Sequence, residues 1–166
     1  MPTIINPDSF KYKADPSALD DFKLKTLVPR LSELCNSKHF VFDLRQLDPG
    51  MYSFPYHFHR NAEELMMIIS GTLTLRSADG LRIINQGEIL FFEMGESSVH
   101  QLYNHGTVPC TYLDIKSNMG IDVVEYPDSG KVNISPMKMI FEKHTQVNYN
   151  KGEENIRKIW DELKNE

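Results

Sequence analysis

The sequence predicts an all-β protein, built as an antiparallel sandwich or barrel, and three observations support this. From residue 38 to about residue 115, short apolar runs alternate with turn residues at intervals of about ten residues. The runs are rich in isoleucine, leucine, phenylalanine, tyrosine and valine, which favour strands. A chain of 166 residues, of which 40% are hydrophobic, has enough apolar material for one sizeable core. We therefore expect one domain spanning residues 1–166.

Residues 1–37 are expected to form an extended N-terminal arm. Four prolines lie among mixed polar and apolar residues in the first 30 positions, and proline removes a backbone donor and ends helices. One helical turn is expected around PSALDDFK, residues 16–23. Pairing of this arm with the sheet edge of a neighbour would cover apolar surface, so we expect a homodimer.

Eight strands are predicted in the centre of the chain, and residues 38–148 are assigned to the barrel and its return strands. Two or three further extended segments are expected in residues 121–145, on either side of a turn at PDSGK. The eight predicted strands are HFVFDLRQL (39–47), YSFPYHFHR (52–60), ELMMIIS (64–70), TLTLRS (72–77), LRIINQ (81–86), EILFFEM (88–94), VHQLYN (99–104) and CTYLDIK (110–116).

The C-terminal residues change period and predict a helix over 151–165. Its apolar residues recur at i, i+3, i+4 and i+7, which places them on one side of a helix. Asn150 and Glu153 resemble a capping pair, so the helix is expected to begin near residue 151. The apolar residues are Ile156, Ile159, Trp160 and Leu163.

Composition and charge exclude several classes of function. The net charge is -5, the pI is about 5.7 and no run of lysine or arginine occurs, so nucleic acid and anionic membranes are poor candidates as partners. No stretch reaches the roughly 18 apolar residues of a membrane span, and the N-terminal stretch lacks the pattern of a signal peptide. We expect a cytoplasmic protein. Cys35 and Cys110 are far apart and are interpreted as buried or half-buried thiols.

Two histidines and a glutamate in PYHFHRNAEEL predict a metal site. Side chains alternate along a strand, so His57 and His59 project from one face and Phe58 from the other. Glu64 begins the next predicted strand and shares the parity of its inward positions, whereas Glu63 does not. Two neutral imidazoles and a carboxylate suit a divalent transition metal, and leaving them buried and unpaired would cost several kcal/mol.

His100, at the start of another predicted strand, is the fourth candidate ligand. Three histidines and one carboxylate leave one or two coordination positions open for water or substrate. The other titratable residues are interpreted more simply: His39, His105 and His144 as structural or surface histidines, and Glu63 and Glu93 as solvated or turn residues. The apolar residues around the motifs, Phe54, Met66, Met67, Phe91 and Phe92, are interpreted as barrel filling.

Two stretches of the chain resemble the paired motifs of the cupins, small double-stranded β-helix proteins. The first family motif is G, five residues, HxH, three or four residues, E, six residues, G. Residues 50–71 match it, with six residues before His57. The second motif is G, five residues, PxG, two residues, H, three residues, N. Residues 87–104 match it with Gly95, His100 and Asn104 in place, although Glu93 stands at the proline position and four residues separate Gly95 from His100.

The resemblance implies a jelly-roll barrel with the arm and the C-terminal helix as additions, and a tendency to dimerise. It implies one divalent transition metal per chain (Fe, Mn, Ni, Zn or Cu) held by His57, His59, Glu64 and His100. An even number of extra residues before His100 preserves its inward parity. Asn104 is interpreted as a structural residue. A single pair of motifs makes the chain a monocupin.

Cupins differ widely in activity, so the fold leaves three hypotheses open. The first is an isomerase-like metalloenzyme or binder for an oxygen-rich small molecule: a sugar, sugar phosphate or small acid. Cationic anchors for a phosphate could come from Arg76, Arg82 or Lys116, which lie on predicted strands. The second is an Fe(II) or Cu dioxygenase for an apolar or aromatic substrate. The third is a non-enzymatic module that binds a small molecule.

Overall fold

A computed structural model describes residues 2–164, and within them 13 strands form three antiparallel sheets. The six-stranded sheet has the order β1-β2-β3-β10-β5-β8, the four-stranded sheet β13-β12-β11-β4 and the three-stranded sheet β7-β6-β9. The strands are β1 (Lys11–Ala14), β2 (Lys25–Val28), β3 (Phe40–Leu47), β4 (Phe58–His59), β5 (Glu64–Ser70), β6 (Thr72–Ser77), β7 (Gly80–Asn85), β8 (Ile89–Phe92), β9 (His100–Tyr103), β10 (Cys110–Ser117), β11 (Asp122–Tyr126), β12 (Lys131–Ser135) and β13 (Met139–Glu142).

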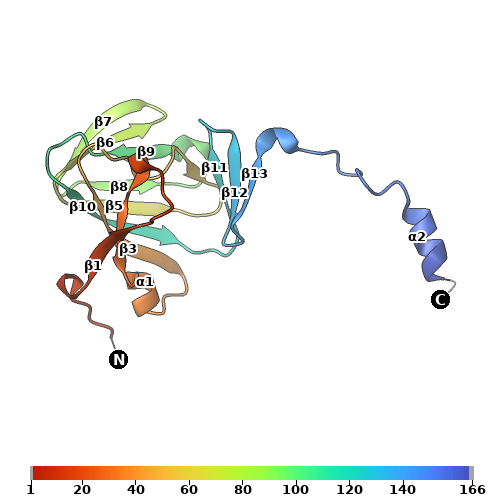
Figure 1. The fold of residues 1–166 in the computed structure, drawn as a ribbon, viewed down its shortest axis with the longest axis horizontal. Helices are drawn as coiled ribbons and strands as arrows, with labels where there is room; N and C mark the ends of the chain where they lie inside the picture. Colours follow the sequence, from red (N-terminus) through yellow and green to blue (C-terminus); the bar gives the residue numbers. More distant parts are fainter. Residues whose placement is uncertain (1, 165–166) are drawn as a thin grey trace.

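The predicted all-β jelly-roll barrel is confirmed (Figure 1). Each of the eight central segments contains a strand, and the three return strands lie where the pattern of residues 121–145 predicted them. The second segment is the least regular, because only Phe58 and His59 of residues 52–60 are in a strand. Pro55 cannot donate to a ladder, so this stretch bends before it reaches β4.

The N-terminal arm belongs to the six-stranded sheet of its own chain. β1 pairs with β2 over all four residues, and β2 pairs with β3 through Lys25↔Gln46 and Thr26↔Arg45. The expected helical turn is a 3₁₀ turn, Asp20–Phe22, and a short helix, α1 (Leu31–Leu34), follows β2. The pairing that was expected with a neighbour is therefore made within the chain, and β1 forms the sheet edge.

The C-terminal helix begins later than expected. α2 spans Ile156–Leu163, and the proposed capping pair is wrong, since Asn150 and Glu153 are joined by a backbone bond in a turn. Gly152 has φ +91, a left-handed conformation that interrupts a helix at this point. Residue 165, the expected end, lies outside the described residues. Figure 1 shows α2 at the end of an extended segment that leads away from the barrel.

The core lies inside the barrel and is formed by alternate residues of its strands. Met66 and Phe92 are buried in it and Phe54 packs against it, as predicted. Met67 and Phe91 were also expected to fill the barrel, but they are 38% and 60% exposed. The alternation of side chains explains this error, because neighbours on a strand face opposite sides of the sheet.

The two cysteines agree with their interpretation from the sequence. Cys110 is buried and Cys35 is half-buried, and both are free thiols. Among residues 2–164, no helix has the length and hydropathy that a membrane span requires.

Candidate metal centre

The four predicted ligands come from strand ends that the backbone holds together. His57 and His100 form an isolated β-bridge, in which each amide donates to the other residue's carbonyl at 3.1 and 2.9 Å. His59 ends β4, where it lies opposite Val124 of β11. Glu64 begins β5, with β10 on one side and β8 on the other. The site is therefore built where all of these strands converge at one end of the barrel.

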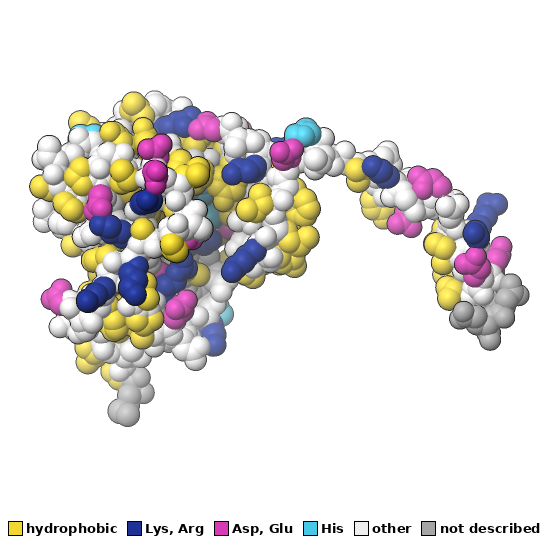
Figure 2. Space-filling model, viewed as in Figure 1, with side chains coloured by type: hydrophobic (Ala, Val, Ile, Leu, Met, Phe, Trp, Pro, Cys, Tyr) yellow, Lys and Arg dark blue, Asp and Glu magenta, His cyan; other side chains and the backbone are white. Residues whose placement is uncertain are grey.

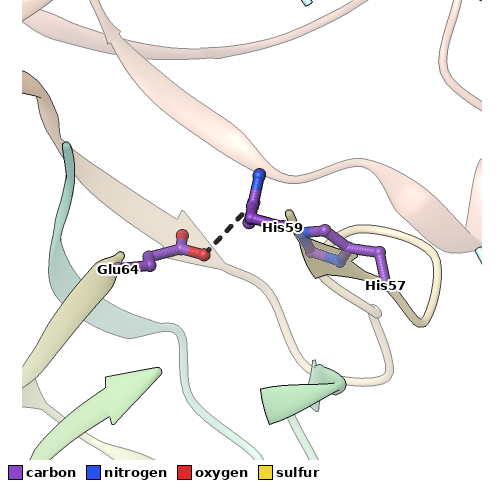
Figure 3. Close-up of side chains that lie close together, drawn as sticks. All are labelled: His57, His59 and Glu64. Carbon is purple, nitrogen blue, oxygen red and sulfur yellow. Dashed lines mark ion pairs between the residues drawn. The ribbon is translucent and has the colours of Figure 1, made fainter. Parts of the chain in front are cut away.

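The side chains of His57, His59 and Glu64 meet at one point (Figure 3). One ligand atom from each lies within 4.8 Å of the others. Nε2 of His59 is 3.6 Å from Oε2 of Glu64, and Nε2 of His100 is 3.3 Å from the same oxygen. His100 is outside the tightest group of three, although its ring centroid is 4.7 Å from that of His57. All four residues are buried.

Each histidine uses its Nδ1 atom for a second contact. Nδ1 of His57 is 2.8 Å from the carbonyl oxygen of Pro55, and Nδ1 of His100 is 2.9 Å from that of Ser98. Carbonyl oxygens only accept, so both Nδ1 atoms must carry the hydrogen. In a neutral ring, Nε2 then carries the free lone pair that a metal requires.

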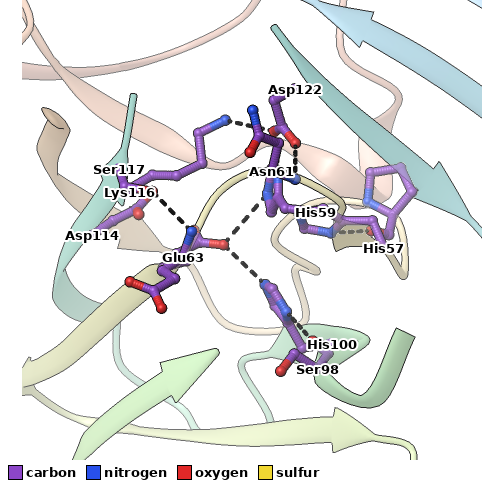
Figure 4. A network of polar contacts seen from close by, with 12 residues as sticks. His57, His59, Asn61, Glu63, Ser98, His100, Asp114, Lys116, Ser117 and Asp122 are labelled. Atoms are coloured by element: carbon purple, nitrogen blue, oxygen red, sulfur yellow. Dashed lines mark hydrogen bonds and ion pairs between the residues drawn. The ribbon is translucent and has the colours of Figure 1, made fainter. Parts of the chain in front are cut away.

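His59 is oriented by a carboxylate that sequence reasoning missed. Its Nδ1 lies 2.5 Å from Oδ2 of Asp122, the first residue of β11. Asp122 also accepts from the amide of Asn61 at 3.1 Å, and Nζ of Lys116 lies 3.6 Å from it (Figure 4). Nothing in the spacing of the motif indicates a residue so far along the chain. A carboxylate behind a metal-binding histidine fixes its tautomer and raises its basicity.

The protonation states suit a cation. Burial, followed by the nearby His100, lowers the pKa of His57 to about 3, so this ring is neutral at pH 7. Burial acts to raise the pKa of Glu64, but the adjacent imidazoles of His100, His57 and His59 outweigh it and hold this pKa below its usual range. The cluster therefore presents an ionised carboxylate beside the neutral ring of His57.

Two atoms of the cluster have no hydrogen-bond partner among the described residues. Oε2 of Glu64 and Nε2 of His100 are both buried, and neither forms a hydrogen bond. An unpaired buried polar atom is costly, and each such atom calls for an explanation such as an ion. The donor set, three imidazoles and a carboxylate, fits a divalent transition metal.

The histidines and glutamates that were not predicted as metal ligands lie outside the cluster, and Asn104 has a structural role. His39, His105 and His144 are exposed, as are Glu63 and Glu93. The side chain of Asn104 is fully buried in a structural role: it donates to the carbonyls of Leu47 and Val108 and accepts from the amide of Gly106.

A cavity of about 340 Å³ opens beside the cluster. Three cations line it, Arg30, Arg45 and Lys116, so Lys116 is the strand cation that faces inward. Arg76 instead pairs with Asp128, and Arg82 with Glu88, at the surface. The remaining lining residues are Val41, Phe54, His57, His59, Glu64, Asp114, Val124, Tyr126, Asn133 and Ser135.

The three cations of the cavity differ in how fully they are paired. Nε of Arg45 donates to Oδ2 of Asp114 at 2.9 Å, and both side chains are buried. Burial and the charge of Glu64 raise the pKa of Asp114 to about 7, although Arg45 opposes the shift. Arg30 is 3.7 Å from Asp43 and Lys116 is 3.6 Å from Asp122, too far for good hydrogen bonds. These two cations therefore retain donors for a ligand.

Comparison with known proteins shows the same architecture. Residues 44–116 match the sequence model of the cupin domain. A sugar phosphate isomerase of the cupin superfamily from Silicibacter pomeroyi superimposes with a TM-score of 0.76 at 20% identity, over 89% of this chain and 98% of that one. A protein named as a candidate sugar phosphate isomerase, from Acidithiobacillus ferrooxidans, gives a TM-score of 0.67 at 25% identity, over 75% of this chain and 80% of that one.

A third structure shares the fold at greater distance. A predicted oxalate decarboxylase from Thermotoga maritima superimposes with a TM-score of 0.57 at 17% identity, over 69% of this chain and 98% of that one. No curated protein matches the chain in sequence.

Proposed function

Since the chain belongs to the cupin superfamily, we propose that it binds one divalent transition metal through His57, His59, Glu64 and His100. The observation that carries this proposal is that Oε2 of Glu64 and Nε2 of His100 lie buried, 3.3 Å apart, without a hydrogen bond. An ion between them would satisfy both atoms, and iron, manganese, nickel, zinc and copper all accept such a donor set.

We further propose that the ligand is an oxygen-rich small molecule with an anionic group, such as a sugar phosphate or a small acid. A bound metal would polarise a carbonyl or hydroxyl group of this ligand. The loosely paired Lys116 and Arg30 would hold the anionic group, because both line the cavity and retain free donors. The name of the Acidithiobacillus protein agrees with an isomerase that acts on a sugar phosphate.

The other two hypotheses receive less support from the cavity. A dioxygenase for an apolar substrate would need a mostly apolar pocket, but Val41, Phe54 and Val124 share the lining with six charged or imidazole side chains besides Lys116. A binding module without catalysis would use the same residues as an isomerase, so turnover is the measurement that separates these two.

The experiment compares two ligands that differ by one phosphate group. Calorimetry of the metal-loaded protein should give a dissociation constant for a sugar phosphate that is at least tenfold lower than for the same sugar without phosphate. Lys116→Met should remove most of this difference, while Lys11→Met, at an exposed position of β1, should leave it unchanged. Equal affinity for both ligands would contradict the anionic class, and conversion of the sugar phosphate to its isomer would establish the enzyme.

A further inference from the structure

The outer face of the six-stranded sheet carries apolar side chains, although it faces the solvent. The strand register forms two apolar rows that run across β3, β10, β5 and β8 on this side of the sheet. The first row is Phe42, Ile115, Leu65 and Phe91, and the second is Leu44, Leu113, Met67 and Ile89. Antiparallel sheets that have one solvated face normally carry polar residues there. We call this surface, with Phe40 and Ile69 at its ends, the outer sheet face: Phe40, Phe42, Leu44, Leu65, Met67, Ile69, Ile89, Phe91, Leu113 and Ile115.

The opposite side of the same strands carries the polar groups. Arg45, Glu64, Asp114 and Lys116 all point into the barrel mouth and line the cavity. On the outer sheet face, Ile89 is 62% exposed and Phe91 is 60% exposed. A contiguous apolar patch on a sheet is typical of an interaction surface.

The C-terminal arm, residues 137–163, also exposes apolar side chains. Every residue in it is exposed, including Met139, Ile140 and Phe141 on both sides of β13. α2 adds one apolar stripe, visible as hydrophobic side chains along the C-terminal segment (Figure 2). Trp160 in this stripe is 58% exposed. A helix of eight residues is marginal in water on its own, so it requires a surface to pack on.

We propose that the C-terminal arm of one chain packs its α2 stripe on the outer sheet face of a second copy, and that the contact is reciprocal. The arm leads away from its own barrel, so a second copy can receive it without any change in its direction (Figure 1). The ion pairs of Glu125 with Lys143 and Arg60 fix where the arm leaves the barrel.

Dimensions favour an arm rather than two sheets face to face. The outer sheet face covers four strands, or about 15 Å at the usual strand spacing, and α2 is about 12 Å long from its eight residues. A stable interface needs about 800 Å² from each partner, which is more than a patch of roughly 15 by 20 Å supplies. The arm provides the additional apolar area, with Val147 and Tyr149 in its linker.

Packing of the arm would also support the cavity. β13 pairs with β12 through four residue pairs, and β12 supplies Asn133 and Ser135 to the cavity wall. A partner that covers β13 therefore holds one side of the candidate site. The dimer does not depend on the metal or on the ligand, so its failure and the failure of the proposed function are distinguishable.

Trp160 is the single tryptophan of the chain and reports directly on the arm. Sedimentation velocity of the full-length protein should show a dimer, and its tryptophan emission should be blue-shifted as in an apolar environment. A monomer with water-like emission would overturn the proposal. A monomer with blue-shifted emission would place the arm on its own barrel, and a dimer with water-like emission would give another interface; both overturn it.

Mixing two variants tests the reciprocal contact. Met67→Glu damages the face and Trp160→Glu damages the arm, so each alone should raise the dimer dissociation constant at least tenfold. In a mixture, the only tryptophan belongs to the Met67→Glu chain, and an excess of Trp160→Glu protein should restore its blue shift. Lys158→Gln, on the polar side of α2, is the matched control and should remain a dimer. No blue shift on mixing, with both variants folded by circular dichroism, would refute the exchange of arms.

Discussion

His59 and Asp122 are joined by a contact of 2.5 Å between Nδ1 and Oδ2, although 63 positions separate them in the chain. β4 and β11 are neighbours in the four-stranded sheet, and this pairing sets the carboxylate behind the ring. The contact turns Nε2 of His59 toward Glu64, at 3.6 Å. Both side chains are buried, so this contact holds the ring more firmly than a hydrogen bond at the surface would.

Asp122→Asn is expected to lower metal affinity about 10- to 100-fold, as loss of a carboxylate behind a metal-binding histidine usually does. Asparagine keeps the size of the side chain but loses its charge, so the fold should persist. Competition with a chromogenic chelator measures the dissociation constant. Asp128→Asn removes a surface partner of Arg76 instead and should change nothing. Equal affinity in the two variants would mean that Asp122 does not act on the metal.

Glu64→Gln and Glu63→Gln separate the two adjacent glutamates. Glu64 is buried among the imidazoles, whereas Glu63 is exposed. For the native protein, metal at about 100 times its dissociation constant should stabilise the fold by about 2.7 kcal/mol, seen as a higher midpoint of thermal unfolding. Glu63→Gln should keep this increase and Glu64→Gln should lose most of it. An undiminished increase in Glu64→Gln would contradict the assignment.

Much of this site could be predicted from the sequence, because its chemistry is written in local patterns. Alternation along a strand placed His57 and His59 on one face, and the same rule chose Glu64 over Glu63. Asp122 could not be found in this way, since its role depends on which strands become neighbours. Lys116 was among three cations on strands, and only the three-dimensional cavity distinguished it from Arg76 and Arg82.

For the fold, the positions of the strands could be predicted from the sequence, but not all of their pairings. Apolar runs and turn residues located the strands, because burial and turn geometry act over a few residues. Pairing of the N-terminal arm within its own sheet is a long-range choice that local pattern does not reveal. Met67 and Phe91 were assigned to the core because they are apolar. They alternate with the buried residues Met66 and Phe92, however, and therefore face outward.

Cys110 is expected to be inert to thiol reagents in the folded protein. Burial raises its pKa to about 11, so at pH 8 very little of it is the reactive thiolate. Titration with a disulfide reagent at pH 8 should modify Cys35, which is half-buried, and should modify both thiols in denaturant. Cys35→Ser should leave the folded protein unreactive. Rapid reaction of two thiols without denaturant would contradict the burial of Cys110.

Gly71→Ala should be more destabilising than Gly80→Ala. Both glycines have positive φ, +82 and +111, and strain of this kind costs about 1–3 kcal/mol for other residues. A β-carbon at Gly71 would also lie 3.1 Å from Cα of Cys110, while at Gly80 it would meet nothing within 4 Å. Urea denaturation measures both losses of unfolding free energy. Equal losses would show that the chain around Cys110 yields to the added methyl group.

The most direct test of the metal centre is the metal content of protein purified without chelator, measured by mass spectrometry. The native chain should carry close to one divalent transition metal per molecule, and the double variant His57→Ala, His59→Ala should carry almost none. The variant His39→Ala, His105→Ala removes two exposed histidines instead and should keep the native content. Equal metal in all three proteins, or none in the native chain after incubation with the metals named above, would contradict the proposed centre.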